Sequence, residues 1–174
     1  MTFNIIEPHA DDAFLSLGGH IDSWIKKGYM VNIVTVFSGT RKRAVDAEMY
    51  AKKMKCSWRG LGFIEGEPLS EEALLLNLEG EVIVPLSLTH NEHLLVRELY
   101  ESNYECLYYL DQPYALIQKN TDLINDKIKD KKIYSYLKPN KRKYKNIPLF
   151  KDQAKFFHFN NEDKLIQIIE MIFK

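Results

Sequence analysis

The run from Tyr29 to Phe37 constrains the fold of this chain more than any other stretch. Most of its residues are β-forming and apolar, namely Met30, Val31, Ile33, Val34, Val36 and Phe37. A strand that is buried on both faces of a parallel sheet has this composition. An apolar segment at residues 2–7 and helical patterns at residues 11–27 and 41–55 surround it. This alternation predicts right-handed βαβ units, and hence an α/β fold with a mostly parallel sheet flanked by helices.

The remaining pattern extends this alternation along the chain. We expect a strand within 57–64, a helix at 71–77, a strand at 82–84, a helix at 91–100 and a strand at 106–110. The last third is less regular, with helices expected at 145–157 and 163–173. The second of these carries Leu165, Ile168, Ile169 and Ile172 on one face. A length of 174 residues without a repeat or linker predicts a single domain over residues 1–174.

Charge and composition exclude several classes of protein. The 24 lysine and arginine residues balance the 24 aspartate and glutamate residues. This balance argues against a nucleic-acid partner, because proteins that bind nucleic acids usually present a strongly basic face. No apolar run approaches the roughly 18 residues of a membrane span, and no signal peptide is evident. Cys56 and Cys106 lie far apart and are expected to be reduced thiols, which suits a cytoplasmic protein.

The sequence Pro8-His9-Ala10-Asp11-Asp12 follows the first expected strand and opens the first expected helix. Ligands of open α/β sheets bind outside the carboxyl ends of the strands, so this turn is a candidate site. Aspartate is also a favoured N-cap residue, and by itself the motif is as consistent with helix capping as with metal binding. Within the following helix, Gly18 and Gly19 cost about 1 kcal/mol each relative to alanine, which predicts close packing of this helix.

A second motif, Thr89-His90-Asn91-Glu92-His93, follows the fourth expected strand. Residues three apart project from the same side of a helix, and the two motifs converge if the first and fourth strands are neighbours in the sheet. Catalytic zinc typically takes three protein ligands and keeps one position open. The chain offers His9, Asp12 and His93 as such a set, with Asp11 and His90 beside it. This is an inventory for metal-assisted amide hydrolysis.

Two further histidines lie outside both motifs. We expect His20 to be a helix-surface or packing residue and His158 to be a tail residue, neither of them a ligand.

Together the motifs resemble the PIG-L/LmbE-like family of zinc-dependent N-acetylglucosamine deacetylases. The first motif, the Gly-Gly pair and the histidine pair carry this resemblance. Residues 113–115 (PYA) and 145–153 (KNIPLFKDQ) are similar to later family segments, so the resemblance extends from residue 3 to about residue 157.

The resemblance implies a Rossmann-like, doubly wound domain with Zn²⁺ held by His9, Asp12 and His93. It further implies that Asp11 is the general base and that His90 stabilises the oxyanion or protonates the leaving amine. Arg43 would contact the substrate. The implied reaction removes the N-acetyl group of an N-acetylglucosamine-type sugar or glycoconjugate and releases acetate.

Some residues depart from the family pattern and leave the choice of substrate open. Glu7 stands where a small residue is usual, and Glu92 replaces an aspartate. The glycine-rich substrate loops between the third and fourth strands are shortened. Two alternatives therefore remain: a metal-binding member of the fold without catalytic activity, and an amidase that acts on a non-sugar N-acyl substrate.

The stretch from 127 to 145 is rich in lysine and arginine. It is either a solvated loop or a contact for a small-molecule N-acetylated sugar that carries a phosphate, such as a nucleotide-linked or lipid-linked sugar. The sequence leaves the oligomeric state open, a homo-oligomer included.

Overall fold

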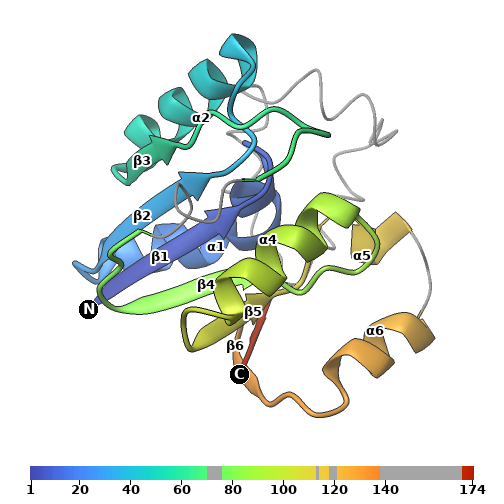
Figure 1. The fold of residues 1–174 in the computed structure, drawn as a ribbon. Helices are drawn as coiled ribbons and strands as arrows, with labels where there is room; N and C mark the ends of the chain where they lie inside the picture. Colours follow the sequence, from blue (N-terminus) through green and yellow to red (C-terminus); the bar gives the residue numbers. More distant parts are fainter. Residues whose placement is uncertain (70–75, 113, 118–120, 138–169) are drawn as a thin grey trace.

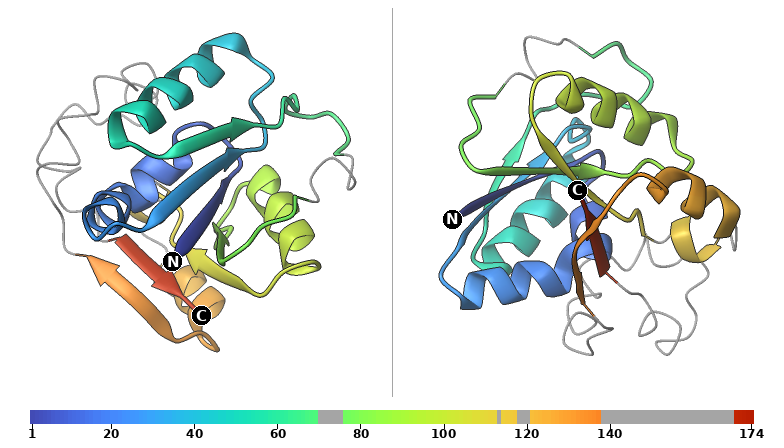
Figure 2. Two further views of the ribbon diagram at one scale, coloured as in Figure 1. Left: turned by 90° about the vertical axis from the view of Figure 1, so that its left-hand side faces the viewer. Right: turned by 90° about the horizontal axis from the view of Figure 1, so that it is seen from below.

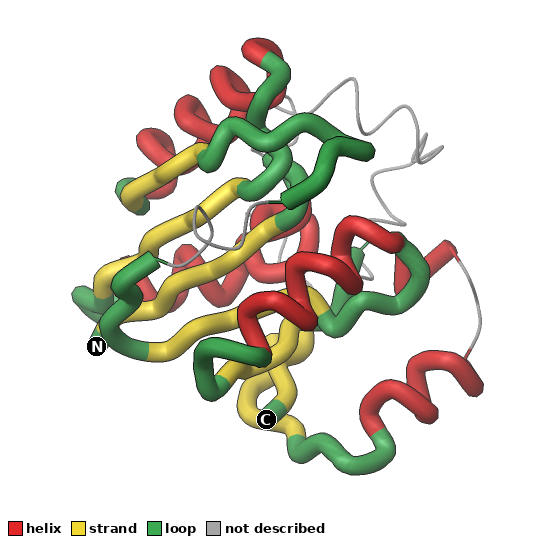
Figure 3. Tube along the Cα trace, in the orientation of Figure 1, coloured by secondary structure: helices red, strands yellow, loops and turns green. Residues whose placement is uncertain are grey.

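One sheet of seven strands forms the centre of the molecule, with helices packed against it (Figure 1, Figure 3). The computed structural model describes residues 1–69, 76–112, 114–117, 121–137 and 170–174. The elements are β1 (Thr2–Glu7), α1 (Asp12–Lys26), β2 (Met30–Thr35), α2 (Arg41–Met54), β3 (Ser57–Gly60), β4 (Glu81–Pro85), α4 (Asn91–Glu101), β5 (Cys106–Tyr109), α5 (Tyr114–Ile117), α6 (Thr121–Ile128), β6 (Ile133–Leu137) and β7 (Glu170–Phe173).

The strand order is β3-β2-β1-β4-β5-β7-β6, in which β1 to β5 are mutually parallel. β1 lies between β2 and β4, with Ile5 opposite Ile33 on one side and Ile83 on the other. The strand order reverses at this point, so β1 and β4 flank the switch point of a doubly wound sheet. The predicted α/β class is confirmed, as is the adjacency of the first and fourth strands on which the convergence of the motifs depended.

The helices form a layer on each face of the sheet (Figure 2). On one face, α1 buries a stripe that packs against β1 and β2 and reaches α2 through contact of the rings of Phe14 and Tyr50. On the other face, Val96 and Tyr100 of α4 pack against Val34 of β2 and against β4. Alternate residues of the central strands therefore face opposite layers, as expected for strands buried on both sides. None of the helices that the structure describes is long and apolar enough to cross a bilayer.

The end of the chain corrects one prediction. Residues 170–173 were expected to finish a helix, but they form β7, which pairs antiparallel with both β5 and β6. Ile172 and Phe173 are buried at 0% and 1% exposure between these partners. A short apolar run fits either a strand or a helix, and here the available sheet edge decided the outcome. Residues 163–169 lie outside the described part, as does the expected helix at 145–157.

Smaller differences concern element boundaries and elements that the sequence did not predict. β3 ends at Gly60 rather than extending toward Ile64. The expected helix at 71–77 lies mostly outside the described residues, and Leu76 and Asn77 are not helical. The sequence predicted none of α5, α6 and β6, of which β6 lies within the basic stretch.

β7 is tied to α1 through a buried carboxylate. Glu170 accepts hydrogen bonds from the backbone N–H groups of Gly19 at 2.8 Å and His20 at 2.9 Å, and its Oε2 lies 3.0 Å from His20 Nδ1. A Cβ atom on Gly19 would lie 3.1 Å from both oxygens of this carboxylate, so the predicted close packing at the Gly-Gly pair is confirmed at Gly19. His20 is buried and its Nε2 contacts Ser135 Oγ at 3.0 Å, which makes it a packing residue.

The cysteines agree with the sequence-based expectation. Cys56 and Cys106 are free thiols; Cys56 directly precedes β3, and Cys106 is the first residue of β5. Burial raises the pKa of each thiol to about 12. Both are therefore protonated and unreactive at neutral pH.

Candidate metal centre

The turn between β1 and α1 brings His9 and Asp12 together. The backbone N–H of His9 donates to Asp12 Oδ2 at 2.8 Å, and the backbone N–H of Asp12 donates to the carbonyl of His9 at 3.2 Å. His9 Nδ1 lies 3.4 Å from the same oxygen of Asp12. The local turn thus aims an imidazole and a carboxylate at one point beyond the carboxyl end of β1.

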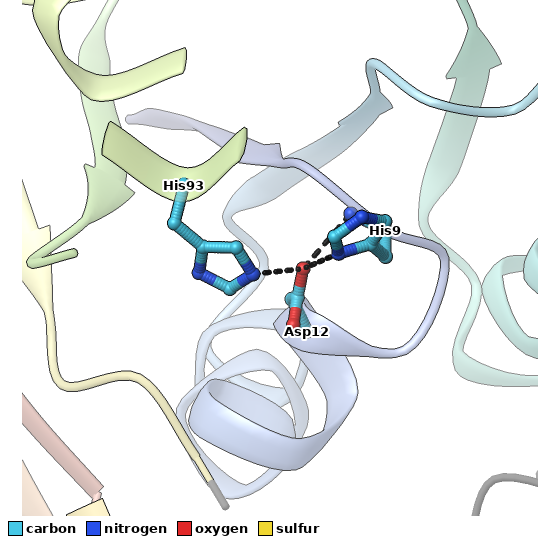
Figure 4. A group of neighbouring side chains, drawn as sticks. All are labelled: His9, Asp12 and His93. Carbon is cyan, nitrogen blue, oxygen red and sulfur yellow. Dashed lines mark hydrogen bonds and ion pairs between the residues drawn. The ribbon is translucent and has the colours of Figure 1, made fainter. Parts of the chain in front are cut away.

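His93 reaches this point from the helix that follows the neighbouring strand β4. It lies in the first turn of α4, and its Nε2 is 3.3 Å from Asp12 Oδ2 (Figure 4). One potential ligand atom from each of His9, Asp12 and His93 falls within 4.8 Å of the others. The structure therefore assembles the three residues that the sequence proposed as a metal set, because β1 and β4 are adjacent.

The cluster is buried, and the carboxylates near His93 favour a positive charge on its ring. The exposed fractions of His9, Asp12 and His93 are 7%, 4% and 0%. Burial by itself would raise the pKa of Asp12, but His93 and His9 hold that pKa well below its ordinary value. Burial likewise opposes a charge on His93, yet the carboxylates of Asp12 and Asp111 raise its pKa to about 10. The environment of His93 therefore favours a positive charge at this position.

These features fit a bound metal ion. Neither ring nitrogen of the buried His93 has a hydrogen-bond partner of good geometry within the described part of the chain, although buried polar atoms are usually paired. A metal competes with protons for imidazole, so it would replace the positive charge that the carboxylates favour on His93. Two imidazoles and one carboxylate are a ligand set that catalytic zinc uses.

The structure adds two carboxylates that the sequence analysis did not identify as site residues, those of Asp111 and Glu65. Asp111 Oδ2 lies 3.8 Å from His93 Nδ1 and accepts a hydrogen bond from the backbone N–H of Leu88 at 2.8 Å. Glu65 Oε1 lies 3.6 Å from His9 Nε2. The position of Asp111 just after β5 was a usable signal, because the carboxyl ends of parallel strands meet at one edge of the sheet. Glu65 lies in a loop after β3, where the sequence carries no comparable signal.

His90 stands beside the cluster as the N-cap residue of α4. Its ring centroid is 5.4 Å from that of His9 and 5.3 Å from that of His93. Its Nδ1 lies 2.5 Å from Glu92 Oε2. Burial opposes ionisation of Glu92, but hydrogen bonds from its own backbone and from His90 lower the pKa of this carboxyl. The ring of Tyr114 packs against His90 and His93, with centroids 5.5 Å from each.

Asp11 and Arg43 are the remaining predicted site residues. Asp11 is 7% exposed and is the N-cap residue of α1, yet its side chain makes no capping hydrogen bond. The structure therefore does not support helix capping as the role of the Asp11 side chain. Arg43 lies in the first turn of α2, and its side chain is outside the described part of the structure.

Glu7, the unusual residue before the first motif, is also built into the turn. It is 1% exposed, and its carboxylate accepts hydrogen bonds from Thr35 Oγ1 at 2.5 Å and from the backbone N–H of Ala13 at 2.9 Å. Trp58 Nε1 in turn donates to Thr35 Oγ1 at 2.8 Å. Burial raises the pKa of Glu7 well above its ordinary value. Glu7 thus links the first turn of α1 to β2 and β3.

Fold and side chains together define an α/β protein with a candidate metal centre at the switch point of its sheet. No family model matches the sequence, and no curated protein matches it by sequence.

Solved structures match over nearly the whole chain. A deacetylase in the biosynthesis pathway of teicoplanin is 16% identical, with a TM-score of 0.70, and the match covers 95% of this chain and 90% of that one. The zinc inhibited form of teicoplanin deacetylase Orf2 is 15% identical, with a TM-score of 0.69 over 95% and 89% of the two chains. N,N'-diacetylchitobiose deacetylase from Pyrococcus horikoshii is 17% identical, with a TM-score of 0.54 over 99% and 83%.

A fourth match is to an enzyme that catalyses a different kind of reaction. GalB, the 4-carboxy-2-hydroxymuconate hydratase from Pseudomonas putida, is 12% identical, with a TM-score of 0.62 over 99% of this chain and 95% of that one. These neighbours are members of the PIG-L/LmbE family, so the resemblance predicted from the motifs is confirmed at the level of the fold. Because a hydratase shares this fold with deacetylases, the reaction has to be argued from the site.

Proposed function

We propose that this protein is a zinc-dependent N-deacetylase that hydrolyses the acetamide of an N-acetylglucosamine-type sugar or glycoconjugate and releases acetate. The observation that carries the proposal is the buried His9, Asp12 and His93 cluster, whose ligand atoms lie within 4.8 Å of one another at the switch point. The likeness of the fold to deacetylases supports it.

The proposal assigns the metal to the side chains of His9, Asp12 and His93. When bound, zinc supplies Lewis acidity, which lowers the pKa of water and polarises an amide carbonyl. Two neutral imidazoles and one carboxylate leave such an ion with a net positive charge, which suits a reaction that develops negative charge on a carbonyl oxygen.

Asp11 is proposed as the general base that takes the proton from the attacking water. It directly precedes Asp12 of the proposed ligand set and is buried in the same turn. A carboxylate held beside the attacking water contributes typically about 100- to 10,000-fold to the rate.

His90 is proposed to donate a hydrogen bond or a proton on the substrate side. Its Nδ1 faces Glu92, which leaves Nε2 as the nitrogen available to the oxyanion or to the leaving amine. The lowered pKa of Glu92 keeps that carboxylate ionised, so Glu92 can accept a hydrogen bond from Nδ1–H of His90 and orient the ring.

Substrate recognition and cellular context remain predictions from the sequence. Arg43 is the proposed substrate contact, and a phosphate- or nucleotide-linked sugar is one form of the substrate that the basic stretch would suit. The free thiols of Cys56 and Cys106 are consistent with a cytoplasmic protein.

The proposal is tested by metal analysis followed by an acetate-release assay. The protein is stripped, reloaded with zinc, cobalt or manganese in turn, and assayed with a panel of free and phosphate-linked N-acetyl sugars and with N-acyl amines that are not sugars. We expect one metal per chain and acetate release from a sugar. Metal binding without acetate release from any panel member would favour the non-catalytic alternative, and activity on the amines alone would favour the non-sugar amidase.

His93→Gln provides the matching variant, because it keeps a polar side chain but removes the imidazole ligand. We expect loss of metal and of activity. Glu98→Gln on the exposed side of the same helix is the control and should retain both. Full metal content in His93→Gln would exclude His93 as a ligand.

A further inference from the structure

Each of the two candidate metal histidines lies between two carboxylates. His9 directs Nδ1 toward Asp12 Oδ2 at 3.4 Å and Nε2 toward Glu65 Oε1 at 3.6 Å. His93 directs Nε2 toward Asp12 Oδ2 at 3.3 Å and Nδ1 toward Asp111 Oδ2 at 3.8 Å. The inner carboxylate, Asp12, is shared, whereas each histidine has an outer carboxylate of its own.

This arrangement bears on which ring nitrogen is free to bind a metal. A neutral imidazole carries one N–H group, and only the other nitrogen has the lone pair that a metal needs. An acceptor beside one nitrogen keeps the hydrogen there and thereby selects the tautomer and orients the ring. Each histidine turns its nitrogen nearer to Asp12, the shared candidate ligand, toward the metal position. Glu65 lies beside the other nitrogen of His9, and Asp111 lies beside the other nitrogen of His93. With a metal bound, these outer carboxylates therefore favour hydrogen on Nε2 of His9 and on Nδ1 of His93.

We propose that Glu65 and Asp111 are positioning residues that orient the metal histidines, so that His9 binds through Nδ1 and His93 binds through Nε2. The inference rests on the proposed metal centre and adds two residues from outside both sequence motifs. It also assigns opposite ring nitrogens to the two ligands, because their outer carboxylates approach from opposite ends of the rings.

The two outer carboxylates differ in how firmly the surrounding structure holds them, and Asp111 is the more firmly held. Asp111 is 1% exposed, and its Oδ2 is fixed by the backbone N–H of Leu88 at 2.8 Å. The next residue, Gln112, is held by its backbone N–H to Ser16 Oγ of α1 at 3.0 Å. Residues 111–112 are thus hydrogen-bonded both to the loop after β4, which leads to α4 and His93, and to α1, which carries Asp12.

Glu65 is held less firmly. Its side chain is 45% exposed in the loop after β3, so water and salt weaken its interaction with His9. We therefore expect Asp111 to contribute strongly to metal affinity at any ionic strength. Glu65 should contribute weakly, and its contribution should decline as salt is added.

The direct test uses the wild-type chain with isotope-labelled histidine and an NMR-active cadmium ion in place of zinc. Coupling between cadmium and nitrogen identifies the bound nitrogen of each histidine. We expect coupling to Nδ1 of His9 and to Nε2 of His93, with hydrogen on the opposite nitrogens. Coupling to the same nitrogen type in both residues would overturn the inference and leave the metal centre itself intact, whereas a wild-type chain that binds no metal would overturn both.

Variants test the carboxylates themselves by metal titration, with folding checked by circular dichroism. Asp111→Asn should raise the metal dissociation constant about 10- to 100-fold, which is typical for an outer carboxylate of a metal histidine. Its control is Glu170→Gln, a buried carboxylate that contacts α1 away from the ligands, which should destabilise the fold without changing metal affinity. An unchanged dissociation constant in a folded Asp111→Asn protein would refute the role of Asp111.

Glu65→Gln should weaken binding less than about 10-fold at low salt, and the difference from wild type should vanish at high salt. Glu67→Gln, in the same exposed loop, is the control and should bind as wild type does. Equal binding by Glu65→Gln and wild type at low salt would refute the role of Glu65, and this variant stays informative if Asp111→Asn does not fold.

Discussion

Replacing Asp11 by asparagine separates the chemistry of the site from its assembly. Asparagine and aspartate are comparable N-cap residues and similar in volume, and Asp11 makes no capping hydrogen bond with its side chain. We therefore expect the protein to fold, with a change in the free energy of unfolding of about 1 kcal/mol, the typical size for a single substitution. Metal content should also be unchanged, because the ligand cluster consists of His9, Asp12 and His93.

Turnover should respond very differently, because an amide cannot accept a proton from water. The general-base contribution of about 100- to 10,000-fold corresponds to about 2.7–5.4 kcal/mol in the activation free energy. The acetate-release assay at saturating substrate measures this loss, while thermal unfolding and metal analysis monitor assembly. Asp22→Asn is the control, since Asp22 accepts a hydrogen bond from Lys26 farther along the same helix.

Two results would refute this reasoning. Full activity of Asp11→Asn would exclude Asp11 as the base. Loss of metal from the same variant would instead place Asp11 within the ligand set.

Further predictions concern the parts that support the site. Glu170→Gln should lower the free energy of unfolding by about 1–3 kcal/mol, because a buried acceptor of N–H groups on α1 is lost; denaturant unfolding measures it, and an unchanged midpoint would contradict it. Thr35→Val should destabilise by a similar amount, because the hydroxyl that donates to Glu7 and accepts from Trp58 is removed; tryptophan fluorescence reports both unfolding and the altered indole contact. In the metal-free protein, the raised pKa of His93 means that protonation stabilises the fold fully below the ordinary pKa of 6.5, and that this stabilisation is lost as the pH rises to about 10; thermal unfolding with a chelator should show this decline, and a flat profile over that window would count against it.

The fold explains how such a site can be built from a short chain. Parallel strands deliver their following loops to one edge, and the reversal of strand order between β1 and β4 brings the segments after these two strands together there. A hydratase shares this fold, which indicates that the fold is compatible with more than one chemistry. The side chains at the edge, above all Asp11 beside the ligand cluster, are therefore what argues for hydrolysis.

The sequence by itself determined the local elements and the candidate ligands. The apolar run of β2 and the amphipathic pattern of α1 depend on neighbouring residues, so their periodicity is visible in the sequence. His9 and Asp12 lie three residues apart in one turn, and their mutual contact is local as well. The proximity of His93 needed one further assumption, the adjacency of β1 and β4, which the doubly wound order supplied.

Tertiary structure alone decided the pairings between distant residues. Glu170 meets His20 across 150 positions of sequence, and Asp111 and Glu65 reach their histidines from loops that follow different strands. The apolar spacing at the end of the chain fitted a helix, yet residues 170–173 became a strand because β5 offered an edge where Ile172 and Phe173 could be buried. Periodicity records which face of an element is apolar, but it does not record which element will cover that face or which charge will lie opposite a buried side chain.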